Sequence, residues 1–153
     1  SHAKSTAAFA THLLEAGRAT GVSLPLCRRA RDLCWTSTRY MAREVVSDLK
    51  RRDVKLSGAT VALVGLFRAL DVLEDGLEPE AELIELFSKN RLHVMPCKPW
   101  EDEPAQDGEG LHPLRVALKA SRCAVVLAST NRMRREPLDM SGTLLFDFSD
   151  HPV

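Results

Sequence analysis

The side chains best suited to nucleophilic or redox chemistry are four cysteines, Cys27, Cys34, Cys97 and Cys123. No two of them form a C-x-x-C pair, so their spacing indicates neither a zinc site nor a redox dithiol. A nucleophilic cysteine needs a cationic neighbour that lowers its pKa, and Cys27 has one in Arg31, one helical turn away. Free cysteine is usually buried, however, which predicts that Cys27 and Cys34 are apolar thiols. Free thiols also indicate a reducing, cytoplasmic setting.

The other candidates for chemistry do not form the pattern of a catalytic or metal site. The histidines lack an H-E-x-x-H arrangement, and we expect surface or loop positions for His12, His93, His112 and His151. Trp35 and Trp100 are predicted to pack in the core or in a loop, with an interface anchor as the alternative for each. The sequence therefore predicts no catalytic residue and no metal ligand in this chain.

These side chains belong to a chain of 153 residues in which 21 lysines and arginines balance 21 aspartates and glutamates. A net charge of zero gives no general attraction to nucleic acid or to an anionic membrane, so neither is expected as a partner. No apolar run approaches the roughly 18 residues of a membrane span. The length fits one domain, or one domain with a helical extension.

The first 55 residues carry the pattern of helices. Apolar residues between Ala7 and Ala16 predict a first helix that ends near Gly17 and Gly21. Pro25 then opens a long helix with apolar positions at intervals of three, four or seven: Cys27, Ala30, Cys34, Met41, Val45 and Leu49. Another face of this helix carries charged residues: Arg28, Asp32, Arg39, Arg43 and Lys50. The apolar stripe must be covered by the second half of the chain or by another subunit.

Residues 56–153 instead alternate strands with helices. Strands buried on both faces are predicted from the continuous apolar runs Thr60–Gly65, Leu92–Met95, Cys123–Ala128 and Thr143–Asp147. Helices are predicted at Pro79–Asn90 and Leu114–Ala120, and a long polar loop at Pro96–Gly110. This order predicts an α/β fold, in which an N-terminal helical segment precedes a small Rossmann-like parallel sheet. Right-handed crossovers would place helices on both faces of that sheet.

Ligands of open parallel sheets bind beyond the carboxyl ends of the strands. That edge is predicted to hold residues 65–78, the loop from Pro96 and residues 129–137. Gly65 would let a ligand approach the backbone closely, although a lone glycine lacks the G-x-G-x-x-G fingerprint and is often only a turn. Ser129, at the end of a strand, would contact a ligand or cap the next helix.

The ordered set of segments resembles one family, the UDP-glucose/GDP-mannose dehydrogenases. There a central helix leads to a first strand and to the motif G-L-x-[FY]-K-x-x-x-x-D-x-R-x-[ST]-P. Gly65, Leu66 and Pro79 match this motif, and Glu74 takes its acidic position. The family's later segments resemble residues 80–87, 94–100, 121–129 and 145–147 in order and spacing. Residues 26–49 are similar to its central dimerisation helix.

The resemblance implies a nucleotide-sugar-binding and dimerisation region from the C-terminal part of an NAD-dependent nucleotide-sugar 6-dehydrogenase-like protein of polysaccharide biosynthesis. Residues 1–55 would be a helical linker that forms a homodimer, and residues 56–153 a domain that binds the nucleotide sugar. Ligand contacts are expected at Gly65, Leu66, Phe67, Arg68, Glu74, Ser129 and Arg132. The family's NAD domain and catalytic cysteine precede the matched segment. This chain alone would therefore hold no cofactor and would not be an enzyme, and NAD would belong to a longer protein.

The sequence departs from the family where the ligand binds. Ala69 replaces the family's lysine and Gly76 its arginine, unless a shift of one residue lets Phe67-Arg68 stand in for the aromatic–lysine pair. Residues 65–82 contain six acids and one cation, a balance that repels a diphosphate, although a group of arginines at 132, 134 and 135 could compensate. Two alternatives therefore stay open: a non-catalytic assembly domain of the same lineage, and an unrelated flavodoxin-like binding module.

Overall fold

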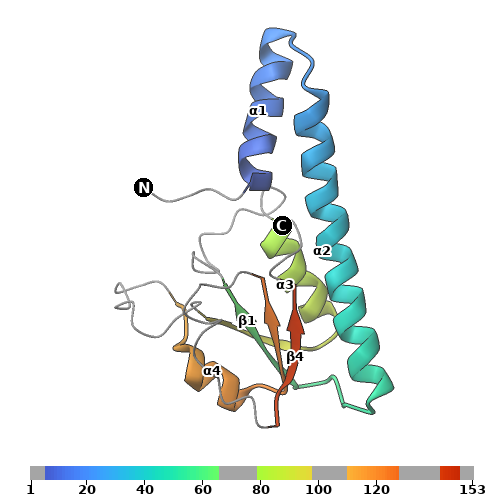
Figure 1. Ribbon diagram of the computed structural model, residues 1–153, viewed down its shortest axis with the longest axis vertical. Coiled ribbons are helices and arrows are strands. Elements are labelled where there is room, and N and C mark those ends of the chain that lie inside the picture. The colour runs from blue at the N-terminus through green and yellow to red at the C-terminus, as the bar shows by residue number, and fades with distance from the viewer. Residues whose placement is uncertain (1–5, 66–78, 98–109, 128–141, 149–153) are drawn as a thin grey trace.

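The computed structural model describes residues 6–65, 79–97, 110–127 and 142–148, and the helices and strands below lie within these ranges. The first two helices, α1 (Thr6–Thr20) and α2 (Pro25–Arg51), form an antiparallel pair that projects beyond the sheet (Figure 1). The turn between them is tight, because a Cβ on Gly17 would lie 2.8 Å from the Val22 carbonyl oxygen. Pro25 starts α2 at a position where a helix needs no backbone N–H donor.

Four parallel strands form the sheet: β1 (Thr60–Val64), β2 (His93–Cys97), β3 (Cys123–Val126) and β4 (Leu144–Asp147). Their spatial order is β2-β1-β3-β4. In the register of the sheet, Leu63 of β1 lies between Pro96 of β2 and Val125 of β3. The predicted α/β fold with a small Rossmann-like parallel sheet is confirmed.

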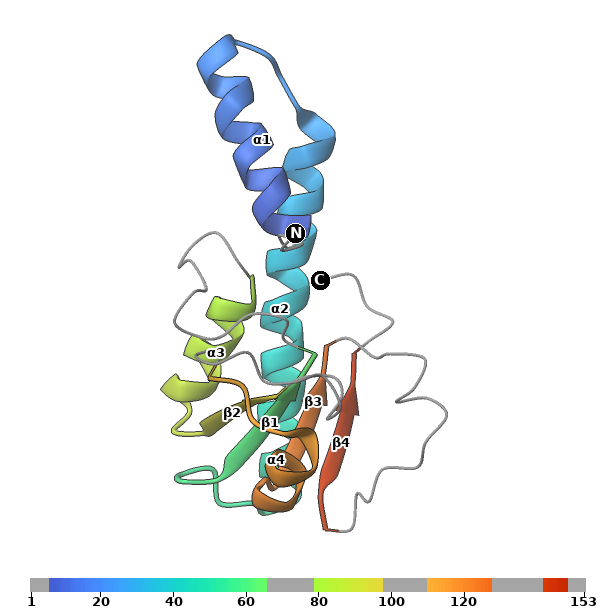
Figure 2. The same cartoon turned by 90° about the vertical axis from the view of Figure 1, so that its left-hand side faces the viewer.

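Helices cover both faces of the sheet, as predicted. One face presents Val61 and Leu63 to α2 and to α3 (Pro79–Lys89), and Phe87 of α3 is fully buried in this larger core. The other face presents Ala62 and Val64 to α4 (Leu114–Ala120), in a smaller core. Figure 2 shows α4 in front of the sheet with α2 behind it. Alternating side chains of β1, β2 and β3 thus supply both cores, which explains why these strands read as continuous apolar runs. The prediction that the last strand is buried on both faces is wrong, because Leu144 and Phe146 of β4 pack on the larger core whereas Leu145 is 54% exposed.

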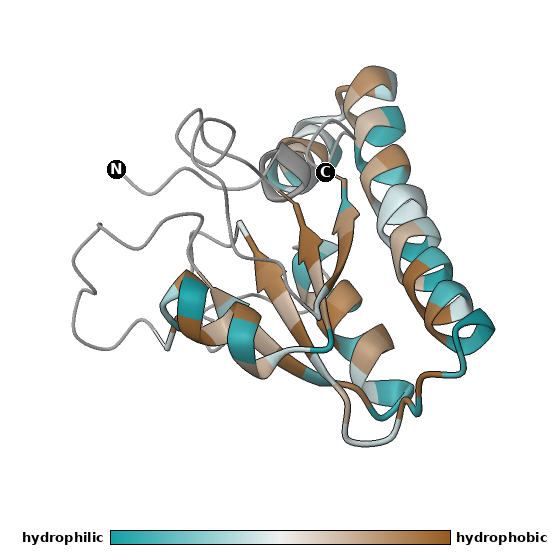
Figure 3. Ribbon diagram, turned by 60° about the horizontal axis from the view of Figure 1, so that its bottom comes forward, coloured by the Kyte–Doolittle hydropathy of each residue, from teal (hydrophilic) through white to brown (hydrophobic). Residues whose placement is uncertain are grey.

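In the C-terminal part of α2, the apolar stripe of this helix is covered by the second half of the chain. Met41, Val45 and Leu49 are at most 1% exposed and pack in the larger core with side chains of β1, β3 and α3. The charged residues predicted for another face are all exposed: Arg28, Asp32, Arg39, Arg43 and Lys50. Figure 3 shows hydrophilic and hydrophobic residues alternating along the ribbon of α2. The boundary between a linker ending at residue 55 and a domain starting at residue 56 stays a prediction.

The second strand differs from its prediction, because it runs through Pro96 to Cys97 and does not end at Met95. Proline is tolerated here because β2 is an edge strand. The backbone N–H of His112 donates to the Pro96 carbonyl at 2.8 Å, on the side of β2 away from β1. The nitrogen of Pro96 faces the same outer side, so no hydrogen bond of the sheet is lost.

Candidate functional site

The strand order reverses direction between β1 and β3. The connection that leaves β1 leads through α3 to β2 on one side, whereas the strand that follows β3 along the chain, β4, lies on the other side. In such sheets the connections that leave these two neighbouring strands run in opposite directions, and a crevice lies between the carboxyl ends of the two strands. The carboxyl ends of β1 and β3 are therefore where this architecture can accept a ligand.

Gly65 occupies that position, directly after β1. Its φ of +102° is a backbone conformation that residues with a side chain rarely adopt. Its N–H donates to the Cys97 carbonyl at 3.3 Å, which ties the end of β1 to the end of β2, and the residue is buried. Gly65 thus combines a conformational need for glycine with a place beside the reversal, and its contact with a ligand stays a prediction.

The other six predicted contact residues lie outside the described ranges: Leu66, Phe67, Arg68, Glu74, Ser129 and Arg132. The structure therefore does not test whether they gather around Gly65. Arg134 and Arg135 also lie outside these ranges.

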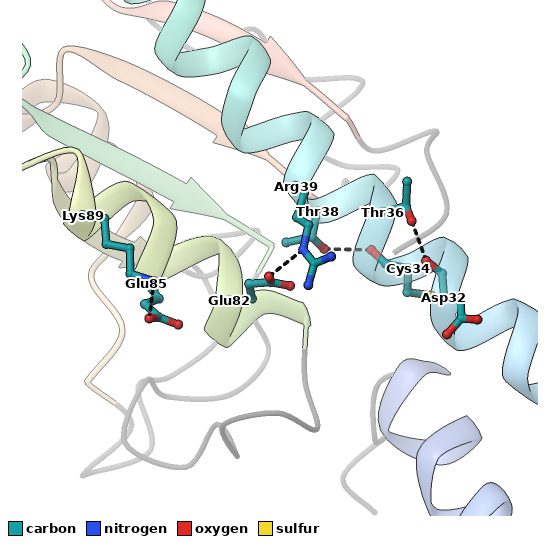
Figure 4. A network of polar contacts seen from close by, with 8 residues as sticks. All are labelled: Asp32, Cys34, Thr36, Thr38, Arg39, Glu82, Glu85 and Lys89. Carbon is teal, nitrogen blue, oxygen red and sulfur yellow. Dashed lines mark hydrogen bonds and ion pairs between the residues drawn. The ribbon is translucent and has the colours of Figure 1, made fainter.

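One acid of the charge-rich segment is already neutralised within the chain. Glu82, in the first turn of α3, accepts a hydrogen bond from Nε of Arg39 at 2.8 Å, and its side chain is only 18% exposed (Figure 4). The same figure shows Glu85 in an ion pair with Lys89, one turn further along α3. Glu82 therefore faces α2 with its charge compensated, which removes part of the repulsion that the sequence predicts for an anionic ligand.

Beside the start of α3, side chains of α1, α2 and α3 line a cavity of about 600 Å³ that is open to solvent. Trp35 lines it together with Arg31 and Arg39 of α2 and Glu82 of α3. This volume is in the range of small-molecule pockets. Because α3 follows β1, the cavity lies toward the same end of the sheet as Gly65. The sequence identified Trp35 only as a packing residue or anchor, since nothing in the spacing joins it to α3.

The thiols are poorly suited to nucleophilic chemistry. Burial raises the pKa of both the Cys97 and the Cys123 thiol to about 12. Burial and, to a lesser extent, the Glu80 carboxylate raise the pKa of Cys34. All four cysteines are free, and Cys27 is only partly buried, in contrast to the prediction that it is buried like Cys34. Cys27 lies in the first turn of α2, on the N-terminal side of the part of the helix that packs on the sheet.

A second apolar stripe on α2 was not predicted. Leu26, Leu33 and Tyr40 follow one another at intervals of seven residues and are 83%, 59% and 50% exposed. They lie on one side of α2, because seven residues make almost two helical turns, and their exposure distinguishes this side from the buried stripe. Their spacing was visible in the sequence. The stripe that faces the core is longer and more regular, however, so the apolar periodicity of this helix was assigned to that stripe alone.

Two further properties concern the described ranges only. They contain no group of three or more His, Cys, Asp or Glu side chains arranged to hold a metal ion. No helix in them has both the length and the apolar character needed to cross a bilayer.

Comparison with known proteins finds a similar fold but no sequence relative. No protein-family model matches the chain, and no curated protein matches it. Among solved structures, a UDP-glucose dehydrogenase from the hyperthermophilic archaeon Pyrobaculum islandicum is similar over 90% of this chain, with a TM-score of 0.50 and 21% sequence identity. The match covers 32% of that enzyme, so this chain spans about a third of its length. The chain therefore has a dehydrogenase-like, Rossmann-like fold.

Proposed function

We propose that this chain is the nucleotide-sugar-binding and assembly region of a nucleotide-sugar-dehydrogenase-like protein, and that the ligand binds at the carboxyl ends of β1 and β3. The observation that carries the proposal is Gly65, a buried glycine with positive φ at the point where the strand order reverses. A solved UDP-glucose dehydrogenase with a similar fold supports the ligand class. Oxidation of the sugar and NAD binding would be functions of a longer protein, in the polysaccharide biosynthesis that the sequence resemblance implies.

Calorimetric titration with UDP, UDP-glucose and GDP-mannose tests this proposal. Gly65→Ala should abolish the heat of binding seen with the unaltered chain, because a Cβ would occupy the approach to the backbone. Gly58→Ala is the matched control, since Gly58 has a φ of +81°, lies before the amino end of β1 and has open space around it. Both variants should lose about 1–2 kcal/mol of stability from the strained φ. If the unaltered chain gives no heat at millimolar ligand, or if Gly58→Ala abolishes binding equally, nucleotide-sugar binding at Gly65 is wrong.

A second candidate function is assembly alone, and the exposed stripe of Leu26, Leu33 and Tyr40 favours it. Apolar residues at heptad spacing on a helix are typical of a face that packs against another helix. Two copies of α2 that cross in antiparallel orientation at Leu33 would place Leu26 of each copy against Tyr40 of the other. A homodimer of this kind is symmetric and buries the same patch on both chains.

The mass in solution tests the assembly. The chain is 17.0 kDa, so a homodimer should have a mass of about 34 kDa. Leu33→Glu should give the monomer mass, because two carboxylates would meet at the crossing point. Val116→Glu, on the exposed side of α4, should leave the dimer intact. A monomeric unaltered chain, or a dimer that survives Leu33→Glu, would reject this interface, and neither result bears on the calorimetric test of the nucleotide site.

A further inference from the structure

A groove runs between α2 and α3 on the outer side of the helical layer, and its volume is about 420 Å³. Its floor is apolar and consists of Leu86, which is partly exposed, and of Ala42 and Val46, which are 5% and 8% exposed and also belong to the larger core. Cations of α2 lie along its rim: Arg39, Arg43 and Lys50. No acidic residue lines the groove in the described part of the chain, whereas the cavity beside Trp35 is lined by Asp32, Glu82 and Glu85 as well as by arginines.

Two of the three rim cations are available to a partner. Arg39 is engaged by Glu82 at 2.8 Å. Arg43 and Lys50 are exposed and form no ion pair with another residue of the described ranges. Asp48, two residues before Lys50 in the sequence, is bound by Arg51 and Arg52 at 2.9 and 2.7 Å. The rim therefore carries uncompensated positive charge beside an apolar floor.

The dimensions of the groove indicate the form of its occupant. From Arg39 to Lys50 the rim extends along α2 for about 16 Å, or three turns, at about 1.5 Å per residue. A helix laid in such a groove contacts it through residues at positions i, i+3, i+4 and i+7, which span almost two turns, and a rim of three turns is long enough to hold them. A narrow apolar floor between two helices matches one apolar helix face, and the cations on the α2 side of the floor match carboxylates on one flank of such a helix.

We propose that this groove docks an acidic amphipathic helix of a partner protein. The apolar side chains of that helix would pack mainly on Leu86, beside the small exposed part of Val46, and its carboxylates would pair with Arg43 and Lys50. This inference is independent of nucleotide binding at Gly65 and of the stripe that contains Leu33, because it uses neither set of residues. Charge pairs at an open rim are individually weak, so the docking should depend strongly on salt.

A synthetic peptide of 14 residues, with leucines at positions i, i+3, i+4 and i+7 and glutamates on the flanks, probes the groove. It is added to the isotope-labelled full chain, and amide chemical shifts are followed by NMR. Shifts should be confined to residues 39–50 and 86–90. Raising NaCl from 50 to 300 mM should weaken binding severalfold. A peptide with lysine in place of each glutamate should not bind.

Charge reversal at the rim supplies the decisive comparison. The double variant Arg43→Glu/Lys50→Glu should weaken binding about tenfold, since two modest attractions become repulsions. The matched control is Arg28→Glu/Arg29→Glu, which reverses two exposed arginines of the same helix outside the groove and should change affinity less than twofold. If the double variant does not fold, Arg43→Gln/Lys50→Gln takes its place, with a loss of about threefold expected.

Three results would overturn the proposal: no shifts at 0.5 mM peptide, shifts outside the groove, or equal losses in the rim and control variants. The last result would mean that the peptide senses only the overall charge of α2. Binding of anionic vesicles that requires Arg43 and Lys50, without binding of the acidic peptide, would assign the rim to a lipid surface instead.

Discussion

The buried thiols predict a specific loss of stability at alkaline pH. Cys97 and Cys123 are fully buried, and their pKa values rise from 9.0 to about 12. The folded chain therefore holds both protons above pH 9, while the unfolded chain releases them. The stability that the two protonated thiols contribute is complete below pH 9 and is lost as the pH rises toward 12.

The size of this loss follows from the shifts. Between pH 8 and pH 10 each thiol should lower the free energy of unfolding by about 1.4 kcal/mol, so the pair should lower it by about 2.7 kcal/mol. Cys34, whose pKa is also raised, acts in the same direction. With an m-value of about 2 kcal/mol/M, this corresponds to a fall of about 1.4 M in the urea midpoint.

Urea unfolding at pH 8, 9 and 10, followed by circular dichroism in the presence of a reductant, measures this dependence. The control is the Cys97→Ala/Cys123→Ala variant, in which the loss between pH 8 and pH 10 should shrink by about 2.7 kcal/mol, whatever its stability at pH 8. The comparison cancels the contribution of lysines, which also titrate near pH 10. If the variant and the unaltered chain show the same pH dependence, burial of these thiols is not its cause.

Two more predictions follow from burial. Leu114→Ala should lower the free energy of unfolding by about 2–4 kcal/mol, because Leu114 is 1% exposed in the smaller core. Val116→Ala on the same helix should change it by less than about 0.5 kcal/mol, because Val116 is 53% exposed. Chemical denaturation measures both losses, and similar values would contradict the placement of α4. In the folded chain a thiol reagent should modify Cys27 first, because it is only partly buried, whereas Cys97 and Cys123 should react only at the rate of unfolding. Mass spectrometry of the modified peptides measures the order, and earlier modification of Cys97 or Cys123 would contradict their burial.

The elements of the fold were predictable because each depends on a local pattern. Pro25 and Pro79 each begin a helix where they were expected to, and the apolar run at Thr60–Val64 forms the central strand. The end of β2 was not predicted, because whether a proline can stay in a strand depends on which side its nitrogen faces. That side follows from the pairing with β1, which no local pattern reveals.

The candidate site was predictable only in part, for a related reason. Gly65 could be singled out because a glycine that closes a buried strand has a local signature. The pairing of Arg39 with Glu82 joins residues that are far apart in sequence and meet only because α3 packs on α2. Likewise, the groove beside Arg43 needs side chains of both helices. Such sites arise from tertiary packing, and the sequence contains their components without their arrangement.

Pro96 also determines how the sheet can interact with other chains. Exposed edge strands are open to pairing with strands of other molecules, which leads to aggregation. On the outer side of β2, Pro96 offers no donor and its carbonyl is occupied by His112, so along this edge a foreign strand would find an interrupted hydrogen-bonding pattern. Replacing Pro96 would restore a donor there and would leave the contact with His112 as the feature that limits strand addition at this edge.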